Sequence, residues 1–402
     1  MDSLTQIVLG AAAGEVVLGK KIGNRALLFG AVGGTIPDLD VLGKFFLSNI
    51  DNLAFHRGIS HSILFSIIGA VIFGWLVHRI YQSAYHKWIA IFCRAVAIVL
   101  VGFALDFVFK IIFPTTIVPT IIAGLGLAFL FYWTSKKSYF TNIWKTPEAN
   151  LRDWQWLFFF SLITHPILDC FTMYGTQLFA PFSDMRVAWS TVSVVDPMYT
   201  VPFLLCLIVA SRFARESKTR RNWTYAGIAL SSFYLLFTVV NKQRINHVFE
   251  TALQKQNIPV ERFITNATIM NNILWNCTAE TDEYFYMGQY SWFDEGEIEF
   301  IQVEKNHHLL NKTETDYTIQ KLRWFSDDYF TVSPLEEKVQ FNDLRFGTFT
   351  GKADNPNDFI FKFILTDNGE EGYYMEESVA GPPEGGGKEM MEKLINRIMG
   401  NK

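Results

Sequence analysis

The sequence predicts a mainly α-helical, polytopic transmembrane domain followed by a small β-rich soluble domain at the C-terminus. Half of the 402 residues are hydrophobic and only 18% are charged, a composition too apolar for an ordinary soluble enzyme. The apolar bias lies before about Ile245, and charged residues recur throughout the remainder. We therefore predict a helical membrane domain over 1–245, a β-rich domain over 246–380, and a linker with a short tail helix over 381–402.

The membrane domain contains apolar segments of the length that a bilayer requires. About 20 residues cross the ~30 Å hydrocarbon layer. Two glycine-rich segments, 3–19 and 26–43, are interrupted by acidic residues, and we expect them to be full spans or a re-entrant hairpin buried against protein. Six other segments are long enough, or nearly so: 62–77, 89–112, 117–134, 154–173, 198–211 and 223–241.

The distribution of Lys and Arg predicts the orientation of this domain. If all eight segments cross the membrane, one set of alternate loops and adjoining span ends holds 15 Lys and Arg residues, and the opposite set holds 6. The positive-inside rule makes the richer set cytoplasmic. The C-terminal domain, which follows the last span, is then expected on the outer, periplasmic side.

The C-terminal part alternates apolar and polar residues in short runs separated by turn-forming residues. This period of two, with aromatic and β-branched residues, is typical of a small antiparallel β domain. We expect residues 250–256 to finish a helix leaving the membrane, 381–387 to form a glycine-rich linker, and 388–399 to form an amphipathic helix. The predicted strands lie at 283–289, 297–303, 322–325, 341–349 and 359–365.

The net charge of the chain bears on its expected partners. The net charge of −4 is close to neutral and no basic run is present, so nucleic acid is not an expected partner, whereas membrane lipids are.

Of the four cysteines, Cys93, Cys170 and Cys206 lie in apolar segments and Cys277 stands alone, without C-x-x-C spacing. Neither a disulfide framework nor a thiolate zinc site is indicated. Any metal would have nitrogen and oxygen ligands.

Ionisable residues inside or at the ends of the apolar segments are the candidate functional residues. Burying them costs several kcal/mol unless they are paired or bind a metal, so within a membrane they are functional candidates. His165 and Asp169 are four residues apart, which places both side chains on one helix face. This spacing suits two ligands of one metal, or a ligand with its orienting carboxylate. The alternative is a buried hydrogen-bonded pair.

A second candidate group surrounds a glycine. His56 and His61 flank Arg57-Gly58, and a tight turn at Gly58 would direct both imidazoles toward one point. Arg57 offers a planar donor fork for phosphate or carboxylate. The alternative is an interfacial loop with solvated histidines.

For three candidate aspartates, helix capping is the alternative to metal binding. Asp38 and Asp40, two apart after Pro37, would point to the same side of an extended stretch, and at a helix start both would still reach neighbouring ligands. Asp196 directly precedes Pro197 at the start of an apolar segment. Helix capping next to proline accounts for each of these aspartates taken alone.

Two more residues are candidates for catalysis or substrate binding. Glu15 lies within an apolar run, where it serves as metal ligand or general base, or else extends to the inner surface. Arg186 would bind an anionic head group, or pair locally with Asp184.

Taken together, these residues predict one metal site near the outer face. Zinc suits mixed His and Asp ligands best, with manganese and iron as alternatives, and the number of ligands allows two ions. A bound divalent metal would provide a nucleophilic water for hydrolysis. Catalytic candidates are Glu15, Arg57 and Arg186, and the candidate metal ligands are Asp38, Asp40, His56, His61, His165, Asp169 and Asp196.

At these residues the sequence resembles the inner-membrane metal-dependent hydrolase family, which includes LexA-regulated, YdjM-like membrane proteins. The resemblance covers roughly residues 1–300. It implies a membrane-bound metal-dependent hydrolase of the inner membrane, with the acidic and histidine positions above as its site. The matching runs are 10–19 with Glu15, 33–41 with Pro-Asp-Leu-Asp, 56–62, 164–182 with His165 and Asp169, 190–200 with Asp196-Pro197, and 272–275.

The expected substrate is a lipid or a lipid-linked ester or phosphoester, because a site at the bilayer surface meets amphiphiles first. A transporter or channel that uses the same acidic and histidine residues as an ion pathway is the alternative. A scaffold that recruits a partner through its β domain ranks last, because it leaves the polar clusters unexplained.

Overall fold

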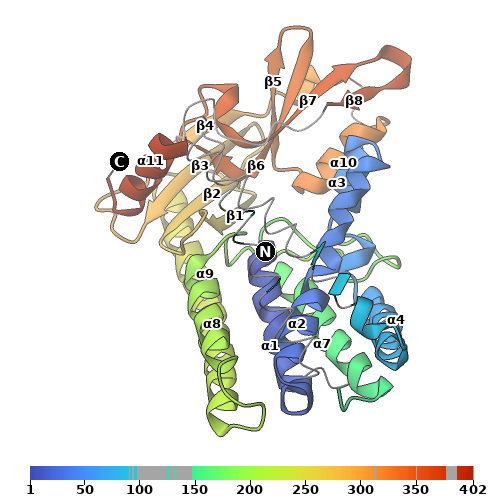
Figure 1. Ribbon diagram of the computed structural model, residues 1–402. Helices are drawn as coiled ribbons and strands as arrows, with labels where there is room; N and C mark the ends of the chain where they lie inside the picture. The colour runs from blue at the N-terminus through green and yellow to red at the C-terminus, as the bar shows by residue number, and fades with distance from the viewer. Residues whose placement is uncertain are drawn as a thin grey trace.

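The computed structural model describes residues 1–89, 147–311, 314–349, 351–376 and 387–401, with isolated positions between 90 and 146. A helical bundle forms one part of the molecule and two β-sheets form the other (Figure 1). The helices of the bundle are α1 (Ser3–Ile22), α2 (Asn24–Thr35), the 3-10 helix η1 (Pro37–Phe45), α3 (Asn49–Phe55), the 3-10 helix η2 (Ile59–His61), α4 (Ile63–Gln82), α7 (Leu151–Asp169), α8 (Pro197–Ala210) and α9 (Lys218–Lys255).

Glycines allow α1 and α2 to pack in close contact. A Cβ atom added to Gly10 would collide with the Gly30 carbonyl, and one added to Gly14 would collide with the Ala26 carbonyl. Glycines four residues apart on two facing helices are a common basis for such close packing within membranes. This close packing of α1 and α2 matters for the candidate functional site, because it also holds Gly34, at the end of α2, against α1.

Positively charged turns gather at one end of the bundle. Lys21, at the end of α1, forms a 2.8 Å ion pair with Asp153 in the first turn of α7. Arg215, between α8 and α9, donates to the Lys21 carbonyl, and Asn24 donates to the Ser211 carbonyl at 3.0 Å. The β-sheets lie beyond the opposite end (Figure 1).

Two of the described helices are long and apolar enough to cross a membrane by length and composition: α4 and α9. The α2–η1 pair, bent by 44°, would be a third, and α8 is a shorter apolar helix. The predicted segments 3–19 and 154–173 correspond to α1 and α7, which do not meet the same criterion. The predicted spans at 89–112 and 117–134 lie outside the described residues, apart from the few isolated positions.

The C-terminal part contains two four-stranded antiparallel sheets, each with its strands in sequence order. The prediction of a β-rich region after the helices is confirmed. The first sheet comprises β1 (Arg262–Ala267), β2 (Leu274–Glu280), β3 (Tyr284–Ser291) and β4 (Phe300–Glu304), and the second comprises β5 (Phe330–Leu335), β6 (Lys338–Thr348), β7 (Phe359–Asp367) and β8 (Tyr373–Met375).

The prediction of a strand at 322–325 is wrong, because this run lies in the helix α10 (Tyr317–Ser326). Asp316 caps the helix by accepting a hydrogen bond from the Ile319 amide at 2.9 Å. Ile319, Leu322 and Phe325 then recur at three-residue intervals and are all buried. That spacing is helical, and a four-residue apolar run does not reveal it. The predicted tail helix is present as α11 (Gly387–Ile398).

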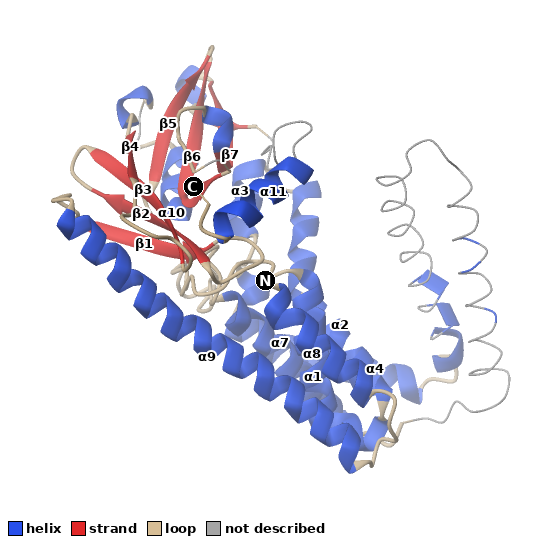
Figure 2. Ribbon diagram, turned by 90° about the vertical axis from the view of Figure 1, so that its left-hand side faces the viewer, coloured by secondary structure: helices blue, strands red, loops and turns tan. Residues whose placement is uncertain are grey.

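The β part packs on the helical part at two places. α9 runs without interruption through residue 245 to Lys255, and Phe249 and Leu253 join the core formed with Trp275 of β2. Figure 2 shows α9 extending from the bundle along the first sheet. At the second place, Ile50 of α3 enters the core that contains Leu322 of α10. The sheets are thus fixed close to the end of the bundle that carries the candidate site.

Candidate metal centre

Three short segments bring their polar side chains to one point at the end of the bundle facing the sheets. Asp38 comes from η1, His61 from η2 and His165 from the last turns of α7. One potential ligand atom from each residue lies within 4.8 Å of the other two, and both imidazoles are buried. Among the described residues, this is the group of three or more His, Cys, Asp and Glu side chains whose potential ligand atoms lie close enough together to hold one metal ion.

The distances within this set have the size expected for ligands of one metal ion. His61 Nε2 lies 3.0 Å from His165 Nε2. Asp38 Oδ1 lies 3.4 Å from His165 Nε2 and 3.7 Å from His61 Nε2. Ligand atoms about 2.0–2.2 Å from a tetrahedral zinc lie roughly 3.3–3.6 Å from one another. The 3.4 Å distance lies within this range, the 3.7 Å distance is slightly above it and the 3.0 Å distance is below it, so the three atoms approximate three corners of such a site.

Hydrogen bonds on the far side of each ring orient the two imidazoles. His165 Nδ1 lies 2.6 Å from the Gly34 carbonyl oxygen, which can only accept, so Nδ1 carries the proton. His61 Nδ1 lies 3.0 Å from Ser60 Oγ and 3.3 Å from Asp40 Oδ2, which favours a proton on that nitrogen as well. In the neutral form of the rings, both Nε2 atoms direct lone pairs to the same point. Metal-binding histidines are oriented in this way.

Asp169 adds a fourth oxygen beside the two rings. Its Oδ2 lies 3.4 Å from His61 Nε2 and 3.5 Å from His165 Nε2. Its Oδ1 accepts from Gln6 Nε2 at 2.9 Å and from the Met1 amino group, whereas the buried Oδ2 accepts no hydrogen bond. A buried carboxylate oxygen without a donor is costly. Arg57 Nε lies 3.3 Å from this oxygen without a hydrogen bond, and a cation between Asp169 and the imidazoles would satisfy it further.

Asp40 and His56 lie behind the cluster rather than in it. Asp40 accepts from the Arg57 amide at 2.9 Å, and its other oxygen lies 2.9 Å from His56 Nδ1. Asp38 and Asp40 lie in the first turn of the 3-10 helix η1, which is the helix-start alternative and not the extended stretch, and they approach His61 from its two ring nitrogens. Asp40 is placed to orient His61, as carboxylates do for ligating histidines.

Arg57 points into the protein and not into solvent. It is 5% exposed and adopts a positive φ of 58°, a conformation uncommon for residues other than glycine. Its Nε lies 3.3 Å from Asp169 Oδ2, and its Nη1 donates to Thr172 Oγ1 at 2.8 Å. The guanidinium also lies 4.8 Å from the centre of the Tyr174 ring. Arg57 is thus a neighbour of the cluster, with one edge committed to protein groups.

Glu15 does not join the cluster. It lies in the second half of α1, and both of its oxygens accept from Arg220 of α9, at 2.6 Å each. Both side chains are buried, so the pair is a bidentate ion pair between two helices. The cations nearest to Glu15 in the sequence are Lys20 and Lys21, and sequence inspection misses the actual partner because Arg220 is 205 residues away.

Asp196 and Arg186 also lie outside the cluster. Asp196 caps α8, where it accepts from the Met198 amide at 3.0 Å, and it accepts from Tyr234 Oη at 2.7 Å. Arg186 donates to the Phe325 carbonyl at 3.1 Å and stacks 4.3 Å from the centre of the Phe325 ring. Asp196 therefore has the capping role that was the alternative explanation, and Arg186 connects the helical part to α10.

Several residues of the site were not predicted from the sequence. The Gly34 carbonyl and Gln6 hold His165 and Asp169, and Tyr174 packs on Arg57 and lies 5.1 Å from the ring of His56. Gln6 gave a usable signal, because it is a polar residue within an apolar run. A backbone carbonyl gives no signal in the sequence.

The chemistry of the donor set fits a divalent metal such as zinc. Two imidazoles and one carboxylate are common zinc ligands, and catalytic zinc sites characteristically use three protein ligands and leave a position for water. The oriented Nε2 atoms and the unsatisfied Asp169 oxygen agree with this assignment. His61, His165 and Asp38 would hold the ion, with Asp169 adjacent.

Comparison with known proteins places the chain in a family. A model of the YdjM inner membrane protein family matches residues 1–245. The chain is also 24% identical over 368 residues to YfhP of Bacillus subtilis (strain 168), described as an uncharacterized protein, covering 86% of this chain and 87% of that relative. No solved structure shows a significant match. Because the family model covers more than half of the chain and includes every residue of the cluster, the chain belongs to the YdjM inner membrane protein family.

Proposed function

We propose that this protein is a membrane-bound metal-dependent hydrolase whose substrate is a lipid or a lipid-linked ester or phosphoester. One observation carries the proposal: the Nε2 atoms of His61 and His165 and Oδ1 of Asp38 converge within 3.0–3.7 Å, beside an unsatisfied Asp169 oxygen. Such a set is costly to bury without a cation. We propose zinc as the ion, because of the ligand types and spacing.

The residues around Asp38, His61 and His165 would have different roles in hydrolysis. A metal bound there would supply a water whose pKa is lowered to about 7. Asp40 and the Gly34 carbonyl keep the imidazoles oriented. Asp169 Oδ2 accepts no hydrogen bond within the protein and would accept one from the attacking water, which would orient that water. Arg57, 3.3 Å from that oxygen, would balance its negative charge.

The surroundings of Asp38 support an amphiphilic substrate. Its side chain is 17% exposed, more than those of the two histidines. An apolar groove of about 320 Å³ between α1, α2 and η1 ends at Leu39, the next residue. Phe45, the last residue of η1, and Phe46 after it are 68% and 87% exposed, which is unusual for aromatic residues facing water. A lipid chain in this groove would bring its head group to Asp38.

We also propose that the helical domain is multi-pass and that the cluster faces the outer, periplasmic side. The turns that carry Lys21 and Arg215 lie at the end of the bundle opposite the cluster. Under the positive-inside rule that end is cytoplasmic. The β-sheets, which lie at the cluster end, would then be periplasmic.

The test is hydrolysis by the purified protein in detergent. Phospholipids and polyprenyl phosphates are offered to wild type and to His61→Ala, each after removal of metal and after addition of Zn²⁺, Mn²⁺ or Fe²⁺. We expect wild type to hydrolyse one substrate class only with metal, and His61→Ala to lose this activity. Equal rates for the two proteins, or no hydrolysis with any metal, would exclude the proposed activity.

Ion transport, the alternative, is less well supported. A transport path needs polar groups that lead from the cluster to the opposite face. Glu15 is the candidate residue nearest that face, and Arg220 occupies both of its oxygens. Uptake of divalent ions into liposomes that Asp38→Asn abolishes would favour transport instead.

A further inference from the structure

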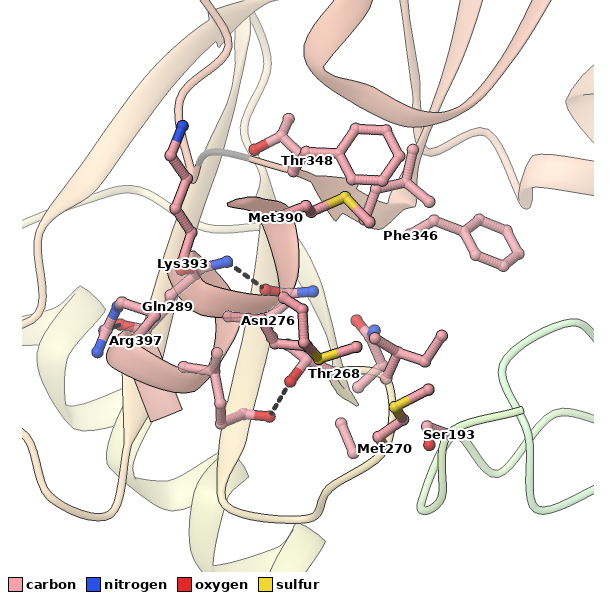
Figure 3. A pocket seen from close by; sticks show the side chains of 18 of the residues that line it. Ser193, Thr268, Met270, Asn276, Gln289, Phe346, Thr348, Met390, Lys393 and Arg397 are labelled. Atoms are coloured by element: carbon pink, nitrogen blue, oxygen red, sulfur yellow. Dashed lines mark hydrogen bonds between the residues drawn. The ribbon is translucent and has the colours of Figure 1, made fainter. Parts of the chain in front are cut away.

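A second cavity, separate from the metal centre, lies between the helical domain and the sheets. Its volume is about 980 Å³, within the range of about 300–1,000 Å³ that is usual for ligand sites. Figure 3 shows Met390 and Phe346 along one side and Met270 with Ser193 along another. The walls come from the loop before α8, the first sheet with the turn after β1, strand β6 and helix α11.

Apolar side chains make up half of the 26 residues that line the cavity. Four methionines contribute: Met173, Met270, Met390 and Met391. Methionine has an unbranched, polarizable side chain that adapts to irregular apolar partners and is frequent on surfaces that bind varied ligands. Such a wall suits a flexible hydrocarbon chain better than a rigid ligand.

Several of the polar groups in the wall have partners within the protein. Asn276 Oδ1 accepts from Gln289 Nε2 at 3.0 Å, a bond drawn in Figure 3. Thr268 Oγ1 donates to the Leu274 carbonyl at 3.2 Å, and Ser193 Oγ donates to the Val195 carbonyl at 2.6 Å. A peptide occupant would bury backbone N–H and C=O groups that need partners. A hydrocarbon chain makes no such demand.

One rim of the cavity lies beside the ends of the apolar parts of α8 and α9. The Met270 amide donates to the Val195 carbonyl at 3.0 Å, two residues before α8 begins. Asn241, at the end of the apolar part of α9, donates to the Asn272 carbonyl at 2.9 Å. Ile269 and Met270 are 50% and 40% exposed there. The cavity thus opens beside the expected bilayer surface through an apolar rim.

We propose that this cavity binds an acyl chain of a membrane phospholipid, withdrawn from the adjacent leaflet, with α11 forming its upper wall. The site is distinct from the metal centre and does not depend on hydrolysis. Arg397 anchors α11 through paired hydrogen bonds of 2.6 and 2.7 Å to Asp294, after β3. Leu394 lines the cavity, whereas the neighbouring Ile395 does not and is 51% exposed.

The adjacent pair Leu394 and Ile395 provides a matched test. The full-length protein is placed in phosphatidylethanolamine–phosphatidylglycerol vesicles containing a trace of phosphatidylglycerol with a diazirine at the end of one acyl chain. After irradiation, labelled peptides are mapped by mass spectrometry. We expect label on α11 and on the turn at 268–270, reduced about tenfold by Leu394→Trp, which fills the cavity, and unchanged by Ile395→Trp.

A second variant that fills the cavity distinguishes loss of the bound acyl chain from detachment of α11. Met270→Trp fills the cavity from the opposite wall and should reduce the label on α11 to the same extent. Absence of label on α11 in wild type, or equal labelling of all four proteins, would overturn the proposal. So would native mass spectrometry that finds a bound peptide in place of lipid. Hydrolytic activity is not used as a readout, so failure of the proposed enzyme function leaves this result interpretable.

Discussion

The Nε2 atoms of His61 and His165 lie 3.0 Å apart, and each ring has its other nitrogen engaged by an acceptor. Two neutral imidazoles cannot both present lone pairs to one point without a shared proton or cation. Asp38 and Asp169 bring negative oxygens to the same point. We propose that a positive charge is held between these groups, and a metal ion is the occupant whose usual ligand spacing comes close to theirs.

Metal content tests this relationship directly. We expect the purified wild type to carry bound metal, measured by elemental analysis, and His165→Ala to lose it, because one of three close ligands is removed. His247→Ala is the control, since His247 is exposed on α9. Equal metal content in wild type and His165→Ala would show that the cluster is a hydrogen-bonded pair without metal.

Asp40 should affect metal affinity without being a ligand. It lies 3.3 Å from His61 Nδ1, on the side of the ring away from His165. Loss of such an orienting group typically lowers metal affinity by about 10–100-fold. We expect this loss for Asp40→Ala in a competition titration with a zinc chelator. Asp184→Ala, at an exposed position, should match wild type. Complete loss of binding in Asp40→Ala would instead make Asp40 a direct ligand.

Glu15 should matter for stability and not for metal binding. Glu15→Gln leaves Arg220 buried without a charged partner, and breaking a buried pair typically costs about 3–5 kcal/mol. We expect a lower unfolding midpoint and normal metal content per folded molecule. Glu216→Gln is the control, because Glu216 is exposed in its 3.8 Å contact with Arg215. Normal stability with lost activity would return Glu15 to the catalytic residues.

Asp51 should give the contact between α3 and α10 a pH dependence. Ser48 and Tyr317 donate hydrogen bonds to its carboxylate and lower its pKa, the latter at 2.7 Å. A carboxylate with a lowered folded-state pKa stabilises the fold above its unfolded pKa of about 3.9, and this contribution is lost as the pH falls through the folded-state value.

The check compares unfolding of wild type and Asp51→Asn across pH, followed by tryptophan fluorescence. We expect wild type to be slightly more stable at pH 7 and the difference to vanish toward pH 3. Gln320→Asn serves as a control on the surface of α10. A difference that grows at acidic pH would contradict the assigned direction of the pKa shift.

Local patterns predicted much of the fold. The apolar segments that became α4, α8 and α9, the β-rich region and the tail helix all follow from composition and periodicity over short windows. The strand predicted at 322–325 failed because the helical spacing of α10 starts at Ile319, outside that window. The bend of the α2–η1 pair was not predicted either, because a 3-10 helix after Pro37 has no distinctive periodicity.

By itself, the sequence determined that the chain has an apolar helical domain with buried acids and imidazoles, and which ligand types a metal would meet. Only the tertiary structure decided that Asp38, His61 and His165 share one point, that Asp169 lies beside them, and that Glu15 and Asp196 have partners elsewhere. The physical reason is distance along the chain. His61 and His165 are 104 residues apart, and their contact depends on packing between η2 and α7, which no local pattern encodes.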